Sequence, residues 1–167
     1  GGRGGAVYHV TSLDDDPDNP LPGTFRYGIT KVSGPRTIVF DVSGYIELKG
    51  RLICSDKYVT IAGQTAPGKG IILRGAPFGM NSDGITRFMR IHRGYAATEA
   101  EQNKGLDGFG IAGGDHAIMD HCSIAWTTDE GFSSRGAKSI TLQRTMISEA
   151  LNSADHPNYS PGTCHGY

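Results

Sequence analysis

Apolar and polar residues alternate along short stretches of the chain, and glycine, proline, asparagine and aspartate separate these stretches. The clearest two are residues 117–124 and 139–146, and the second repeats the pattern of the first at an offset of 22 residues. Alternation at every second residue is typical of a β-strand. Because the link between the two stretches is too long for a hairpin, we expect them to lie on successive coils of a stacked structure.

Six earlier stretches follow the same pattern. We expect strands at residues 6–10, 37–42, 45–48, 58–62, 70–74 and 84–91. No helical period extends beyond about two turns. Short strands that return at regular intervals, with few tight hairpin signals, predict an all-β fold. Its expected form is a right-handed parallel β-helix, in which the chain is a single-stranded solenoid.

Three segments depart from the strand pattern. Residues 25–32 could form one short helix, which would cap the N-terminal end of the stack and hide its apolar face from water. Before it, the run Asp14 to Asp16 lacks the spacing of an EF-hand calcium loop, so a solvated loop closed by prolines is expected. Residues 95–107 form a polar loop longer than a turn, and such insertions in solenoids usually build the binding groove.

Length and composition exclude several classes of protein. The 167 residues suffice for one domain with a hydrophobic core, and a hydrophobic content of 37% with a charged content of 20% excludes a disordered chain. No apolar stretch approaches the roughly 20 residues needed to cross a bilayer, so no membrane partner is expected. The formal net charge of -1 argues against a nucleic-acid partner, which would favour a basic surface.

The three cysteines, an odd number, leave at least one thiol unpaired within the chain. Cys122 alternates with Ile124 on a predicted strand, and we expect it to be a small buried residue. Cys164 stands next to a Pro-Gly turn and is the better candidate for a disulfide.

Three acidic residues stand where successive coils could bring them together. Asp107 precedes the predicted strand 108–111, while Asp129 and Glu130 follow the strand that ends at Trp126. The 22 residues from Asp107 to Asp129 equal one repeat, so the carboxylates would lie about 4.8 Å apart. Like charges at that distance repel, and Ca²⁺, which binds oxygen ligands, would remove the repulsion. A solvated acidic turn without metal is the alternative interpretation.

Four further polar residues are candidates for contact with a substrate: His121, Asp155, His156 and His165. His121 follows Asp120 on a predicted strand, so one of these two side chains must point inward. A histidine buried beside a polar group is the alternative to a functional one. Three arginines, Arg87, Arg90 and Arg93, could recognise carboxylates, although surface arginines on a strand are ordinary.

Segments spread over almost the whole chain resemble microbial pectate lyases and their relatives, polysaccharide lyase family 1. They are GGRGGAVYHVT (1–11), RTIVFDVSG (36–44), TIAGQTAPG (60–68), DHCSIAW with TDE (120–130) and ISEAL (147–151), in the family's order. The resemblance implies a parallel β-helix, a secreted protein, and calcium-dependent β-elimination on polygalacturonate, an acidic polysaccharide of the plant cell wall.

The resemblance also implies roles for single residues. Asp107 and Asp129 match calcium-ligand carboxylates, Glu130 is a third, and Ser133 replaces a further aspartate. The arginine that acts as the base in such lyases lies in a continuation beyond this chain, where no arginine here matches it. We therefore expect residues 1–167 to be the N-terminal and central part of one β-helix lyase domain, completed by a second polypeptide segment. Within the chain, His165 is a candidate for the catalytic group.

Two other functions stay open at this point. A β-helix hydrolase could use Asp129 and Glu130 as its acid pair, but adjacent strand residues point to opposite faces. A non-catalytic carbohydrate-binding or structural β-helix is favoured by the lack of a matching base in the chain. Products with a double bond between C4 and C5 would identify the lyase, and polymer binding without turnover would identify the binding protein.

Overall fold

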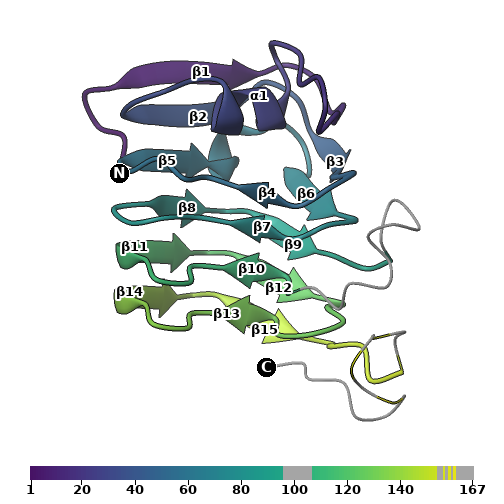
Figure 1. The fold of residues 1–167 in the computed structure, drawn as a ribbon. Helices are drawn as coiled ribbons and strands as arrows, with labels where there is room; N and C mark the ends of the chain where they lie inside the picture. The colour runs from purple at the N-terminus through teal and green to yellow at the C-terminus, as the bar shows by residue number, and fades with distance from the viewer. Residues whose placement is uncertain (96–106, 154–155, 157, 159, 161–167) are drawn as a thin grey trace.

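The computed structural model describes residues 1–95, 107–153, 156, 158 and 160 and is a stack of coils built almost entirely from β-strands (Figure 1). The first sheet contains β1 (Ala6–Val10), β2 (Arg36–Phe40), β5 (Val59–Ala62), β8 (Ile85–Arg87), β11 (Asp115–Asp120) and β14 (Lys138–Gln143). The second contains β3 (Gly44–Glu47), β6 (Ile71–Arg74), β9 (Arg90–His92), β12 (Ser123–Ala125) and β15 (Met146–Ser148). The third contains β4 (Leu52–Ile53), β7 (Phe78–Gly79), β10 (Phe109–Gly110) and β13 (Phe132–Ser133).

Neighbouring strands in all three sheets are parallel, and successive neighbours come from successive coils. The inward residues of each coil therefore stack on those of the next and form one core. In the second sheet, Ile46 pairs with Leu73, Leu73 with Ile91, and Ile91 with Ile124, and all four side chains are buried. This arrangement confirms the predicted parallel β-helix.

Phenylalanine rings run through the core as a column. Successive ring centroids are 5.3 to 5.9 Å apart in the order Phe40, Phe25, Phe78, Phe109 and Phe132. Phe25 belongs to the helix α1 (Phe25–Thr30), which lies at the N-terminal end of the stack (Figure 1). The Thr24 side chain accepts a hydrogen bond from the Tyr27 backbone and caps this helix. The predicted N-terminal capping helix is confirmed.

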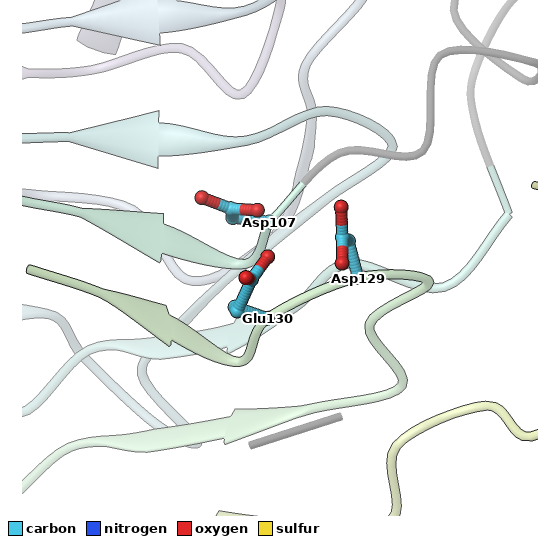
Figure 2. Close-up of side chains that lie close together, drawn as sticks. All are labelled: Asp107, Asp129 and Glu130. Carbon is cyan, nitrogen blue, oxygen red and sulfur yellow. The ribbon is translucent and has the colours of Figure 1, made fainter. Parts of the chain in front are cut away.

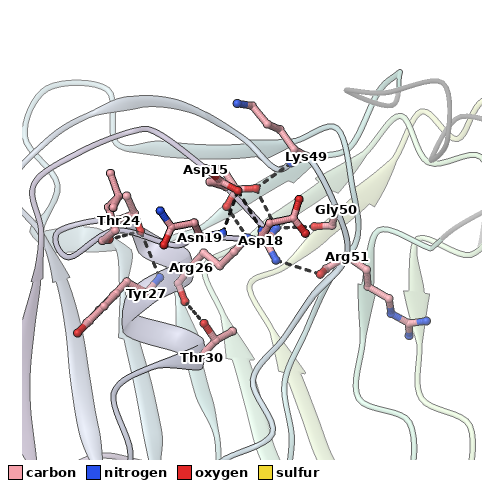
Figure 3. A network of polar contacts seen from close by, with 12 residues as sticks. Asp15, Asp18, Asn19, Thr24, Arg26, Tyr27, Thr30, Lys49, Gly50 and Arg51 are labelled. Carbon is pink, nitrogen blue, oxygen red and sulfur yellow. Dashed lines mark hydrogen bonds and ion pairs between the residues drawn. The ribbon is translucent and has the colours of Figure 1, made fainter.

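The loop before α1 is attached to the core by a buried ion pair (Figure 3). Arg26 donates two hydrogen bonds to the Asp15 carboxylate, at 2.7 and 2.8 Å, and both side chains are almost fully buried. Arg26 also donates to the carbonyl oxygens of Gly50 and Arg51. The expectation of a solvated loop is wrong for Asp15, because the guanidinium satisfies a carboxylate that water would otherwise solvate.

Corners between the first two sheets are made by single residues with left-handed backbone conformation. Phe88, His121 and Arg144 occupy equivalent corners, with φ of 54°, 53° and 47°. Each corner divides a stretch that the alternation predicted as one strand. The expected strands at 84–91, 117–124 and 139–146 are therefore wrong as single strands, because each contributes to two sheets.

The predicted repeat of 22 residues is also wrong by one residue in this part of the chain. Ala117 pairs with Ile140 and Phe109 pairs with Phe132, an offset of 23 residues. A shift of one residue changes which side chains meet on neighbouring strands. The residue opposite Asp107 is consequently Glu130, whereas the sequence pattern placed Asp129 there.

Cys54 and Cys122 are buried thiols, neither paired with another described cysteine, and burial raises the pKa of each. Burial of Cys122 agrees with the sequence prediction. Cys164, Asp155, His165 and nearly all of the polar loop at 95–107 lie outside the described residues. Within the described part of the chain, no helix is long and apolar enough to span a lipid bilayer.

Candidate metal centre

Three carboxylates from two neighbouring coils converge at one edge of the third sheet (Figure 2). Asp107 stands before β10, and Asp129 and Glu130 lie in the turn between β12 and β13. One oxygen atom from each side chain lies within 4.8 Å of the others, and all three residues are partly buried. We call these residues the acidic centre.

Backbone contacts explain why the two coils approach so closely here. Gly108 donates its N–H to the Glu130 carbonyl at 2.9 Å, and Phe109 donates to Gly131 at 3.0 Å. A Cβ atom at Gly108 would lie 2.7 Å from Thr127 Cγ2 and 2.9 Å from the Gly131 oxygen. Only glycine permits this packing without a shift of the neighbouring backbone.

The electrostatics of the acidic centre favour a bound cation or proton. Burial and the neighbouring Glu130 carboxyl raise the pKa of Asp107 to about 6, although a hydrogen bond from Ser133 lowers it. Burial and Glu130 also raise the pKa of Asp129, whereas His156 lowers it. His156 Nε2 lies 3.3 Å from Asp129 Oδ2 and its side chain is buried. Carboxylates this close to one another carry a repulsion that a divalent cation would remove.

The residue types of the acidic centre suit calcium. Ca²⁺ binds six to eight oxygen ligands, and carboxylates are its commonest protein ligands. Asp107, Asp129 and Glu130 offer carboxylate oxygens from two coils. The Ser133 side chain, which stands where the resemblance places another aspartate, bonds to Asp107 and is neutral. The centre therefore has three charged groups in place of four.

A groove of about 340 Å³ lies on the outer face of the third sheet, beside the acidic centre. Its floor is low because Gly79 and Gly110 are the outward residues of β7 and β10, between Ile53 and Ser133 on the flanking strands. Asp107 lines the groove, as do two exposed arginines, Arg51 and Arg135. The sequence analysis missed these arginines, because both lie in turns where no periodic pattern marks them.

His121 does not lie at the acidic centre. It occupies the corner between β11 and β12, where its ring stacks on Phe88 with centroids 4.5 Å apart. Its Nδ1 is 2.7 Å from the Asp120 carboxylate, and Asp120 also accepts from Arg87. Asp120 is the inward member of the pair, so its buried carboxylate is held by Arg87 and His121. Although burial alone would raise the pKa of Asp120, hydrogen bonds from Arg87, Gln143 and His121 hold it below its usual range.

The other two arginines of the sequence analysis differ from each other. Arg90 donates to the Lys69 carbonyl. Arg93 is 1% exposed, although strand arginines are ordinarily surface residues, and it donates to the Thr128 hydroxyl at 3.0 Å. Nothing in the alternation marks Arg93 as buried.

Comparisons with known proteins give consistent results. No family model matches the chain. The chain is 41% identical over 154 residues to a probable pectate lyase C from Emericella nidulans and 39% identical to that from Aspergillus oryzae. In both cases the similarity covers 90% of this chain and 34% of the relative. A probable pectate lyase 13 from Arabidopsis thaliana is 31% identical over 175 residues, with 98% of this chain and 34% of the relative covered.

A solved structure extends the likeness to the fold. The crystal structure of Jun a 1, the major allergen from cedar pollen, matches with a TM-score of 0.69 at 29% identity. The match covers 85% of this chain and 44% of the allergen. The chain spans about one third of the length of the curated relatives it matches. The resemblance found in the sequence is thus confirmed: this parallel β-helix is similar, in sequence and in fold, to part of a pectate lyase.

Proposed function

We propose that the protein is a calcium-dependent lyase that cleaves polygalacturonate, or a related uronic-acid polysaccharide of the plant cell wall, by β-elimination. The observation that carries the proposal is the convergence of three carboxylates beside a groove lined by two exposed arginines. The similarity to probable pectate lyases over 90% of the chain supports the same activity. Secretion is part of the proposal, because the polymer is extracellular.

In this proposal Asp107, Asp129 and Glu130 hold Ca²⁺. Three carboxylates satisfy only part of its six to eight ligand positions, which leaves positions for water and for a uronate carboxylate. Bound calcium would stabilise the negative charge that develops on the uronate as the C5 proton leaves. His156 keeps the Asp129 carboxylate in place through its ring nitrogen.

The arginines at the groove have a separate role. Arg51 and Arg135 are exposed and can pair with carboxylates of the polymer through planar, two-donor guanidinium groups. The C5 proton passes to a base, a role that the proposal assigns to a residue outside this chain, with His165 as the candidate within it. The bond to the C4 oxygen then breaks without attack by water.

The same geometry disfavours hydrolysis. Glycoside hydrolases usually keep two carboxyl groups about 5 to 9.5 Å apart, with room for a water molecule or for attack on the sugar. The carboxylate oxygens of the acidic centre lie within 4.8 Å of one another, and Asp129 and Glu130 are adjacent in the chain. This crowding suits a shared cation better than an acid and a nucleophile.

The test is the ultraviolet absorbance of unsaturated products from polygalacturonate, measured on the whole natural protein with calcium and with a chelator. We expect product only with calcium, and a loss of about 100-fold for Asp129→Asn. Asp41→Asn, at an exposed aspartate paired with His9, is the matched control and should retain activity. Polymer binding without product would support the non-catalytic alternative, and saturated products would support a hydrolase.

A further inference from the structure

We propose that Arg93 and Thr128 form a buried positioning pair that holds the turn carrying Asp129 and Glu130 in the orientation that closes the acidic centre. The inference rests on the proposed function, since it concerns calcium affinity at the same site. Arg93 Nη1 donates to Thr128 Oγ1 at 3.0 Å, and Thr128 is the residue directly before Asp129. Neither residue was expected to act at the centre.

The turn needs such support because it lies outside the sheets. β12 ends at Ala125 and β13 begins at Phe132, so the intervening residues make no ladder of strand hydrogen bonds. Backbone bonds fix the turn at its ends, where Trp126 donates to Glu149 and Glu130 accepts from Gly108. Thr128 lies between these points, and its side chain is 6% exposed.

Arg93 is well placed to serve as the fixed partner. Its side chain is 1% exposed, and its backbone is joined to the next coil, where Arg93 donates to Ala125 and Gly94 donates to Trp126. Arg93 Nη1 also donates to the Gly94 carbonyl at 3.2 Å. A guanidinium is planar, so a bond to it fixes direction as well as distance. The Thr128 hydroxyl therefore has one defined position, and the carboxylate of the next residue is oriented with it.

Charge and positioning predict opposite effects, which makes the inference testable. A buried cation near the acidic centre would repel Ca²⁺, so its removal would strengthen calcium binding if charge alone mattered. A positioning role predicts weaker binding when either partner of the hydrogen bond is removed. Loss of an outer residue that orients a metal ligand typically weakens metal binding by about 10- to 100-fold.

The decisive variants are Thr128→Val and Thr128→Ser in the whole natural protein, with calcium affinity measured by titration calorimetry. Thr128→Val keeps the shape and charge but removes the acceptor, and we expect about tenfold weaker binding. Thr128→Ser keeps the hydroxyl and should bind within about twofold of the natural protein. Arg93→Met should match Thr128→Val, and the double variant should lose no more than either single one. Arg90→Met, on the same strand, is the control.

Two results would overturn the inference: calcium affinity unchanged in Thr128→Val, or tighter binding in Arg93→Met. Amide hydrogen exchange of residues 127–131 in calcium-free protein gives a second readout. Faster exchange of this turn in Thr128→Val and Arg93→Met, but not in Arg90→Met, is expected. If the natural protein binds no calcium, the proposed function fails, and the exchange result still decides whether the pair positions the turn.

Discussion

Gly108 donates its backbone N–H to the carbonyl oxygen of Glu130, and this bond joins two coils at the point where their carboxylates meet. Asp107, one residue earlier, is brought opposite Glu130 by the same contact. The acidic centre is therefore positioned mainly by close backbone packing. A change at a glycine should consequently affect it as strongly as a change at a ligand.

Gly108→Ala should lower the free energy of unfolding by about 1–3 kcal/mol, because the added methyl group would overlap Thr127 and the Gly131 carbonyl. Calcium affinity should fall as the coils separate. Urea denaturation with and without calcium measures both effects. Gly110→Ala is the control, since a Cβ there has only the Ser133 oxygen at 4.0 Å. Equal losses in the two variants would contradict the role of close packing.

Stability in the absence of calcium should depend on pH through Asp107. Its pKa is raised to about 6 in the folded protein and is about 3.9 in an unfolded chain. The folded state therefore binds more protons between these values, and the stability associated with the protonated carboxyl is lost as pH rises from about 4 to 6. Asp107→Asn should lack this loss in thermal melts recorded in chelator.

Calcium should reverse the order of these two proteins. Above pH 6 the ionised Asp107 carboxylate is available as a ligand, so added calcium should raise the melting temperature of the natural protein more than that of Asp107→Asn. The difference should shrink as pH falls toward 5, because protons compete with the metal. A calcium effect independent of pH in this range would argue against Asp107 as a ligand.

The buried pair of Asp15 and Arg26 should be far more costly to break than an exposed one. Asp15→Asn leaves the guanidinium buried without its counter-charge, and we expect a loss of about 3–5 kcal/mol in the free energy of unfolding. Glu47→Gln removes the partner of Arg74 from a pair that is about half exposed, and should cost less than about 1 kcal/mol. Urea denaturation of both variants makes the comparison.

Binding of polygalacturonate should depend on the arginines of the groove. Arg135→Gln or Arg51→Gln should each weaken binding by about 1 kcal/mol, or roughly fivefold, because each removes an exposed charge that faces a polyanion. The effect should diminish at high salt. Arg74→Gln, on the second sheet, should bind as the natural protein does. Loss of binding to a neutral polymer in the same variants would indicate damage to the fold instead.

The alternation of side chains was sufficient to predict the fold, because every second residue of each strand enters a shared core. It failed at the corners, where one residue with positive φ changes the phase. Met119 and Asp120 are both buried and break the alternation, but Asp120 is polar, so the sequence gives no apolar signal of the change. The resulting error of one residue made Asp129, and not Glu130, the expected neighbour of Asp107.

Buried charge was the second kind of error. Asp15 and Arg93 looked like surface residues because burial of a charged group depends on a partner elsewhere in the chain. Asp15 is paired with Arg26, 11 residues away, and Arg93 bonds to Thr128, 35 residues away. Partners of that kind become visible only when the coils are placed side by side. The carboxylates of the acidic centre were found because they follow strands at nearly regular intervals.

The phenylalanine column and its stacked coils make this molecule close to one-dimensional in its energetics. Each coil touches only the coil before it and the coil after it, so a disturbance travels as it would along a row of coupled units. The acidic centre needs only the pairing of β10 with β13, and α1 lies several units away. Loosening of the N-terminal end would reach the centre only by unzipping the intervening coils in turn.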